Sequence, residues 1–261
     1  MARLYPLFSS SKGNSTYIGT QKSGILIDAG VSCKRLCGAL ADNDIEPSAI
    51  QGIFITHTHS DHISGLTVLA KKYEIPIYAQ QTNLEILEEK GKIPPKCKTY
   101  SVDCETICIG DFYVQAFETQ HDTPASCGYR IDTPDGKVVC TCTDLGKITD
   151  TVASFLNGSD LVLLESNYDK QMLRNGSYPY ELKQRIESNF GHLSNDDCGT
   201  HLKKLMKQGT CKFILGHLSQ ENNTPQTAEE AAVSALCDYK RNKDYLLHIA
   251  KPEGCGMAVA F

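Results

Sequence analysis

Thr56-His-Thr-His-Ser-Asp-His62 is the stretch of this sequence that decides how the remainder is interpreted. Its histidines follow the run Gly52–Thr56, which is apolar on both faces and therefore indicates a buried strand. Side chains at alternate positions of an extended segment point to one side, so His57 and His59 are expected to meet. The adjacent Asp61-His62 pair can turn to a second point nearby. Imidazole and carboxylate groups at this density predict a site for Zn²⁺ or Mn²⁺, with Fe²⁺ also possible, rather than a chance cluster in a surface loop.

Short apolar runs separated by turns predict strands and helices along the whole chain. Strands are expected at residues 3–8, 15–19, 24–28, 52–56, 75–79, 99–102, 105–109, 112–118, 128–133, 137–143, 160–165, 212–215, 245–249 and 257–261. Helices are expected at residues 32–43, 63–73, 148–157, 195–208 and 226–241. Both halves alternate strands with helices, so the helices are expected to cover sheet faces in an α/β fold.

Composition excludes several classes of protein. No apolar tract reaches the roughly 20 residues that a membrane span needs, and the N-terminus has no extended apolar leader, so a cytosolic protein without membrane contact is expected. The 12 cysteines do not form paired CxxC motifs, so free thiols are expected rather than a structural zinc site. The formal charge of −5 argues mildly against a polyanionic substrate, but two divalent cations would nearly cancel it.

The stretch at 56–62 resembles the HxHxDH signature of the metallo-β-lactamase superfamily. The resemblance extends along nearly the whole chain and implies an αββα sandwich, in which two mixed β-sheets pack face to face with helices outside. It implies one domain over residues 1–261, without a β-CASP or other large insertion. Only 47 residues lie between Asp144 and His192, which leaves no room for the long cap domain of large nucleic-acid-processing relatives.

The same resemblance implies a ligand set for two metal ions. His121, Asp144 and His217 stand where the superfamily places its later ligands, and the strand that ends at Asp28 stands where a buttressing aspartate is found. One ion would be held by His57, His59 and His121, and the other by Asp61, His62 and His217. Asp144 would bridge them. Two ions about 3.5–4 Å apart can share one water molecule and lower its pKa to about 7. Asp61 would also orient this nucleophile.

Two further residues resemble a catalytic pair. Glu165 ends an apolar run that indicates a buried strand, and His192 precedes an expected helix. They resemble the Glu and His of ribonuclease Z-like phosphodiesterases, which implies that His192 donates a proton or hydrogen bond to the leaving group and that Glu165 orients it. The alternatives are a solvated strand end for Glu165 and a helix N-terminal residue without a chemical role for His192.

The N-terminal segment Ser9–Thr16 suggests a contact with substrate phosphate. Its hydroxyl groups, Gly and Asn can present backbone N–H groups to an anion, but the segment also suits a plain turn, and both interpretations stay open. The candidate substrate-binding residues are Ser10, Ser11, Asn14 and Asn167.

The order of TDLG, LLESNYD, GHLSN and LGHLSQENN is similar to the WalJ/YycJ group, bacterial metallo-β-lactamase-fold proteins regarded as 5′ DNA exonucleases. This likeness implies a two-metal phosphodiesterase acting on nucleic acid, with DNA favoured over RNA. A small-molecule hydrolase of the same fold is the alternative, namely a cyclic-nucleotide phosphodiesterase, lactonase or thioesterase, and it gains if Glu165 or His192 lies far from the metals. A non-catalytic binding protein is disfavoured by the complete ligand set. The oligomeric state is left open.

Overall fold

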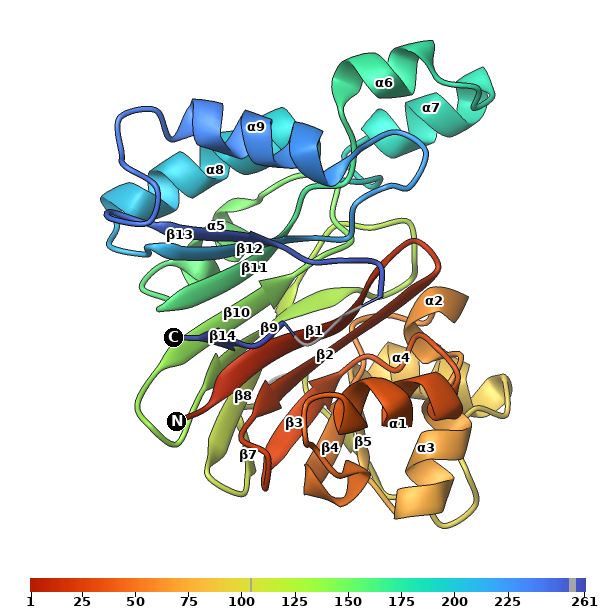
Figure 1. The fold of residues 1–261 in the computed structure, drawn as a ribbon. Coiled ribbons are helices and arrows are strands. Elements are labelled where there is room, and N and C mark those ends of the chain that lie inside the picture. Colours follow the sequence, from red (N-terminus) through yellow and green to blue (C-terminus); the bar gives the residue numbers. More distant parts are fainter. Residues whose placement is uncertain (104, 254–256) are drawn as a thin grey trace.

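Two seven-stranded β-sheets form the centre of the molecule (Figure 1). The computed structural model describes residues 1–103, 105–253 and 257–261. The first sheet has the order β14-β1-β2-β3-β4-β5-β6 and the second the order β13-β12-β11-β10-β9-β8-β7. The strands of the first sheet are β1 (Arg3–Ser10), β2 (Gly13–Gly19), β3 (Gly24–Ile27), β4 (Ile50–Phe54), β5 (Ile77–Ala79), β6 (Thr99–Ser101) and β14 (Val259–Ala260). Those of the second are β7 (Ile107–Ile109), β8 (Phe112–Glu118), β9 (Cys127–Asp132), β10 (Val138–Cys142), β11 (Leu161–Glu165), β12 (Lys212–Gly216) and β13 (Leu246–Ile249).

Helices cover the outer face of each sheet (Figure 1). Beside the first sheet lie α1 (Cys33–Ala41), α2 (Ser60–Ile63), α3 (Leu66–Tyr73) and α4 (Gln81–Glu89), together with a 3₁₀ turn at Pro47–Ala49. On the second sheet lie α5 (Asp150–Leu156), α8 (Asn195–Lys207) and α9 (Pro225–Ala235), while α6 (Lys170–Asn175) and α7 (Tyr180–Glu187) project from it. The Ser194 and Thr224 side chains accept hydrogen bonds from backbone N–H groups at the starts of α8 and α9, as N-cap residues do.

Three apolar clusters hold these layers together. The central cluster joins the two sheets, with Phe54 and Ile25 from the first packed with Tyr129 and Leu163 from the second. A second cluster lies between the first sheet and α1, α3 and α4, and a third lies between the second sheet and α5, α8 and α9. Because each fully buried aliphatic side chain contributes about 1.5–3 kcal/mol, these clusters fix the relative positions of the strand ends.

Each sheet contains a run of parallel strands that leads to the same edge of the sandwich. Strands β3, β4, β5 and β6 are parallel neighbours, and so are β10, β11, β12 and β13. The residues that follow β3 and β4 therefore lie at one edge of the first sheet, and those that follow β10, β11 and β12 lie at one edge of the second. The predicted site residues belong to these strand ends.

The sandwich predicted from the sequence is confirmed, but several elements differ. Helices α4, α6 and α7 lie where none was expected; the α7 sequence is mostly polar, and this helix buries no residue. The helix expected at 63–73 begins only at Leu66, as α3, and Ile63 instead ends the short helix α2; between the two, the Gly65 N–H donates to the Ala29 carbonyl oxygen. The helix expected at 226–241 ends at Ala235.

The other general expectations have mixed outcomes. Every cysteine in the described ranges is a free thiol, as expected, while Cys104 and Cys255 lie outside those ranges. Within the described residues, no helix is both long enough and apolar enough to cross a lipid bilayer. The cytosolic location and the single-domain organisation stay predictions.

Candidate metal centre

The predicted ligand residues all follow strands directly. His57, His59, Asp61 and His62 lie on the loop and short helix after β4, and His121 follows β8. Asp144 and His217 follow β10 and β12. Neither of the last two is a glycine, yet their φ angles are +58° and +53°, in the left-handed region that L-residues rarely adopt. Such strain persists only where the surrounding structure holds it, and it is concentrated at functional sites.

The first cluster consists of His57, His59 and His121. One ring nitrogen from each lies within 4.8 Å of the others. The closest approach is 3.0 Å, between His57 Nε2 and His59 Nδ1. The remaining nitrogen of His121, Nδ1, lies 3.1 Å from the Gly191 carbonyl oxygen, which leaves Nε2 to face the cluster. Three imidazoles with converging nitrogens can hold one divalent cation.

The second cluster surrounds Asp144. Its Oδ2 atom lies 2.9 Å from His217 Nδ1 and 3.4 Å from His62 Nε2, and its Oδ1 atom lies 3.8 Å from His121 Nε2. Asp61 Oδ2 is 3.5 Å from His62 Nε2. The Asp144 carboxylate thus lies between both groups of histidines, and every predicted ligand residue is within 4 Å of another.

Electrostatics differ between the two clusters. Burial lowers the pKa of His57 well below its ordinary value, and the neighbouring His62 lowers it further. Burial opposes protonation of His62 as well, but the Asp28 and Asp144 carboxylates outweigh it and raise the His62 pKa well above the usual range. Burial would raise the pKa of Asp144, yet His217 and His62 lower it well below its usual range. The neutral His57 imidazole and the buried Asp144 carboxylate can therefore both bind cations.

The chemistry of these side chains fits a metal site. Asp144 Oδ2 and His217 Nδ1 are buried and close, yet among the described residues neither has a hydrogen bond of suitable geometry. Buried polar atoms without partners are rare in native proteins and need an explanation. A cation held between them satisfies both atoms. The cluster is therefore able to hold metal ions.

Asp28 and Thr56 support the first loop from beneath. Asp28 accepts hydrogen bonds at 2.8 Å from the Thr56 N–H and from the Thr56 hydroxyl, and its Oδ2 atom lies 2.8 Å from His62 Nδ1. The Thr56 hydroxyl also lies 3.0 Å from His57 Nδ1. A carboxylate that orients a ligand histidine in this way usually tunes metal affinity. Gly30 is required nearby, because a Cβ atom there would come within 1.7 Å of the Asp61 carbonyl oxygen.

Glu165 and His192 lie beside the second cluster. His192 Nδ1 is 2.8 Å from Glu165 Oε1 and 3.9 Å from Asp144 Oδ1. Glu165 is fully buried, and its other oxygen accepts hydrogen bonds from the Leu145 and Leu193 N–H groups. Burial alone would lower the pKa of His192, but the charge and hydrogen bond of Glu165 outweigh it and raise this pKa to about 9. This pKa favours the imidazolium form of His192 at neutral pH, in which the Nε2–H group can donate.

The candidate substrate residues are placed in two different roles. Ser11 and Asn167 line a pocket of about 160 Å³ beside His192. Asn167 also donates from Nδ2 to the His217 carbonyl oxygen. Ser10 and Asn14 are buried and bond to each other, since Asn14 Nδ2 donates to the Ser10 carbonyl oxygen. Asn14 Nδ2 also donates to Asp61 Oδ2 at 3.2 Å, so Asn14 holds a predicted ligand.

Sequence reasoning missed several residues of this pocket. Arg185 and Tyr178 line it, and both come from the segment around α6 and α7 that was not expected to be helical. Arg185 forms an ion pair with Asp122, whose Oδ1 atom lies 3.2 Å from His121 Nε2. The only signal in the sequence was the position of Asp122 directly after His121. Nothing in the spacing pointed to Arg185.

Comparisons with known proteins agree with this fold and site. The family model described as "Beta-lactamase superfamily domain" matches residues 24–249. The chain therefore belongs to the β-lactamase superfamily, in its metallo-β-lactamase-fold form. The metallo-β-lactamase-fold protein YhfI from Bacillus subtilis superposes with a TM-score of 0.73 over 97% of each chain, at 17% identity, which reflects the fold alone.

Two relatives are similar over nearly the whole sequence. Exodeoxyribonuclease WalJ of Streptococcus pneumoniae is 37% identical over 252 residues, which cover 95% of this chain and 93% of that protein. Exodeoxyribonuclease YycJ of Bacillus anthracis is 34% identical over 231 residues, covering 88% of this chain and 87% of the relative. The likeness that the sequence motifs suggested is confirmed, and the chain is a metal-dependent hydrolase by family.

Proposed function

We propose that this chain is a two-metal-ion phosphodiesterase that degrades DNA as an exonuclease from the 5′ end. The observation that carries the proposal is the similarity to WalJ and YycJ over nearly the whole length of all three proteins. The position of His192 and Glu165 beside Asp144 supports it independently. The small-molecule hydrolase considered from the sequence would have gained support if either residue lay far from the site, and neither does.

The ligand assignment proposed here follows the two clusters. His57, His59 and His121 would hold one cation, and Asp61, His62 and His217 the other, with Asp144 between them. Zn²⁺ and Mn²⁺ both suit nitrogen and carboxylate ligands, and Fe²⁺ is a third candidate. Cations bound there would polarise the phosphoryl oxygens and lower the pKa of a water molecule.

The remaining steps belong to side chains of this chain. The Asp61 carboxylate is one-fifth exposed and is fixed by Asn14, so it can accept a hydrogen bond from the attacking water and orient it. His192 can donate the Nε2 proton to the leaving oxygen, since Glu165 holds Nδ1 and stabilises the imidazolium. The adjacent pocket, which Arg185 and Tyr178 line, would receive the phosphate and sugar next to the scissile bond.

A degradation assay tests this proposal. The metal-loaded protein is given four substrates of equal phosphate concentration: 5′-phosphorylated duplex DNA, single-stranded DNA, RNA and a simple phosphodiester. We expect the DNA substrates to be shortened from the 5′ end and the simple phosphodiester to be a poor substrate. Asp144→Ala should be inactive, and Asp111→Ala, which changes an exposed carboxylate, should match the wild type. Better hydrolysis of a lactone or thioester than of DNA would overturn the assignment.

A further inference from the structure

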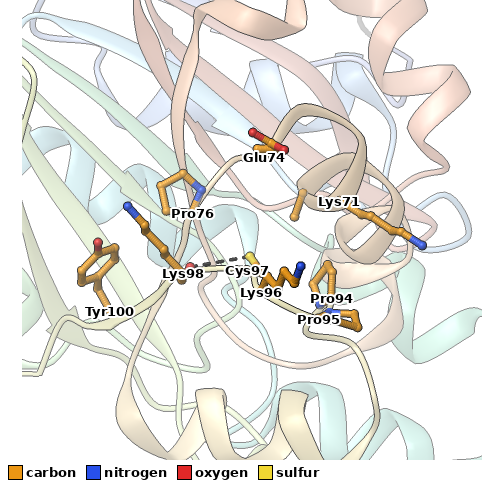
Figure 2. Close-up of a pocket in the computed structure, with 10 residues that line it drawn as sticks. Lys71, Glu74, Pro76, Pro94, Pro95, Lys96, Cys97, Lys98 and Tyr100 are labelled. Atoms are coloured by element: carbon orange, nitrogen blue, oxygen red, sulfur yellow. Dashed lines mark hydrogen bonds between the residues drawn. The ribbon is translucent and has the colours of Figure 1, made fainter.

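A basic hollow lies away from the metal centre, between α3 and the edge strand β6. It has a volume of about 520 Å³ (Figure 2). Its lining includes the side chains of Lys71, Lys96 and Lys98 and a single carboxylate, Glu74. Among the described residues, none of these three ammonium groups has an ion-pair or hydrogen-bond partner. A concave surface with three unpaired cations and one anion favours a negatively charged ligand.

Aromatic and proline side chains complete the hollow. Tyr100 is 43% exposed on β6. One face of its ring stacks on Tyr78, with ring centroids 5.0 Å apart and planes 19° apart, and Tyr78 stacks in turn on Phe54. The Tyr78 ring therefore supports one face of the Tyr100 ring, while much of Tyr100 stays exposed to solvent. Pro76, Pro94 and Pro95 add a stiff apolar surface. A fixed, exposed aromatic ring beside cations is the combination that binds unpaired nucleic-acid bases.

The arrangement of the cations favours a linear ligand over a compact one. In Figure 2, Tyr100, Lys98, Lys96 and Lys71 follow one another across the view instead of converging on one point. A mononucleotide or a free phosphate is best held by groups that converge, whereas a strand of nucleic acid presents one negative charge per nucleotide along its length.

We propose that this hollow is an exosite that binds a single-stranded segment of DNA remote from the scissile bond. The phosphates lie along Lys96, Lys98 and Lys71, and one unpaired base stacks near Tyr100. The inference rests on the proposed function, because the ligand is a part of the same polynucleotide substrate.

The topology defines the path of the strand. The hollow includes Pro76, directly before β5, and Lys98, directly before β6, whereas Asp28 and His57 follow β3 and β4. Because β3–β6 are parallel, the exosite and the metal centre lie toward opposite ends of the same sheet. An oligonucleotide must extend past several residues of strand, at about 3.3 Å each, to reach both. Short oligonucleotides therefore bind one of the two sites only.

Equilibrium binding of labelled single-stranded DNA in the presence of a chelator tests the exosite without catalysis. Oligonucleotides of about 4 and about 16 nucleotides span the usual site sizes. We expect the double variant Lys96→Glu/Lys98→Glu to bind the longer strand roughly tenfold or more weakly than the wild type. The slope of log affinity against log salt should become shallower by about 1.4, since each phosphate contact to a single strand contributes about 0.7. Tyr100→Ala should weaken binding about tenfold with the slope unchanged.

A matched control reverses the same charge elsewhere. Lys22→Glu/Lys34→Glu changes two exposed lysines outside the hollow. Because it changes the net charge by the same amount, it should show only the small general effect of charge, and its affinity for DNA should stay near the wild-type value. Photo-crosslinking of a bromodeoxyuridine-containing strand, followed by mass spectrometry, should locate the attached base at Tyr100. Equal losses in both double variants, a crosslink elsewhere, or a wild type that binds no single strand would overturn the exosite. If these binding results hold but no DNA is degraded, the proposed exonuclease activity fails and the exosite stands.

Discussion

The loops that carry the predicted ligands and the segment around α6 and α7 are built in opposite ways. In the loops, His57, His62, Asp144 and His217 are almost completely buried, and their partners hold them from several sides. Helix α7 buries no residue; Tyr180 at its start and Phe190 just after it are more than half exposed. Both regions border the same pocket, since Asp122, next to His121, and Arg185 line it together.

This difference separates chemistry from recognition. Catalytic groups must be held in a fixed geometry, and buried strand ends provide it. Segments with few buried contacts open at low free-energy cost, which suits a region that admits and releases a polymer. Substitutions in the loops should therefore change the chemical step most, and substitutions on the projecting segment should have small effects.

The largest effect is expected from Asp144→Ala. This carboxylate contacts His62, His121 and His217, so its loss should remove the group shared by both clusters. We expect degradation of DNA to fall by about 10³-fold or more, and the metal content to fall from two ions per chain to one or fewer. Elemental analysis beside a rate measurement checks both. A variant with normal metal content and activity would contradict the bridging role.

His192→Ala should come next and should affect turnover more than binding. The imidazolium is proposed to donate a proton only as the leaving oxygen departs, so kcat should fall about 10²- to 10⁴-fold while the affinity for DNA changes little. Glu165→Gln keeps the size of the side chain and should lie between the wild type and His192→Ala. A raised KM with normal kcat would instead make His192 a binding residue.

Asp28→Asn tests the support beneath the first loop. The buried carboxylate holds Thr56 and His62, and its neutral analogue keeps the shape but weakens the orientation of the histidine. Metal affinity should fall about 10- to 100-fold, as for other residues that orient metal ligands. Competition with a chromophoric chelator measures it. Unchanged affinity would show that His62 is held without Asp28.

His201, on α8, should make the stability of the folded protein depend on pH. Burial and then Lys204 lower its pKa to about 4, below the ordinary value of about 6.5. The unfolded chain therefore takes up this proton first as the pH falls, and stability is lost between about pH 6.5 and pH 4. We expect the wild type to lose about 1–2 kcal/mol of unfolding free energy over this interval, and His201→Gln to keep it. Parallel pH profiles of urea unfolding for the two proteins would refute this.

The smallest effect is expected from Tyr180→Ala on α7. This side chain is 70% exposed, and its hydroxyl only accepts a hydrogen bond from Gln184. The free energy of unfolding should change by about 0.5 kcal/mol or less. A larger loss in a urea denaturation series would mean that the projecting segment is packed in solution more tightly than its burial indicates.

The same contrast explains what could be predicted from the sequence. The strands that precede His57, Glu165 and His217 are short apolar runs, so their ends, and with them the polar residues that follow, could be located. The resemblance to a known superfamily then supplied the grouping of the ligands. The predicted residues do lie together, although their roles as ligands and catalysts stay predictions.

The remainder could not be predicted because it depends on contacts that are distant in the sequence. Helices α6 and α7 lack a broad apolar face, so periodicity gave no signal, and α4 buries only two apolar residues, Leu84 and Leu87. The pairing of Arg185 with Asp122 spans 63 positions. Ser10 and Asn14 resembled a phosphate-binding turn, yet their side chains bond to the loop itself and to Asp61.

Hydrolysis of phosphodiesters by two cations held in these clusters is the hypothesis on which the other predictions depend. Its most direct test starts from exhaustively chelated protein at known concentration and follows the release of nucleotides from 5′-phosphorylated DNA as Mn²⁺ or Zn²⁺ is added back. We predict no activity without metal and a rise that ends at two equivalents per chain. Full activity in the chelated protein, or saturation at one equivalent, would show that hydrolysis does not need two cations.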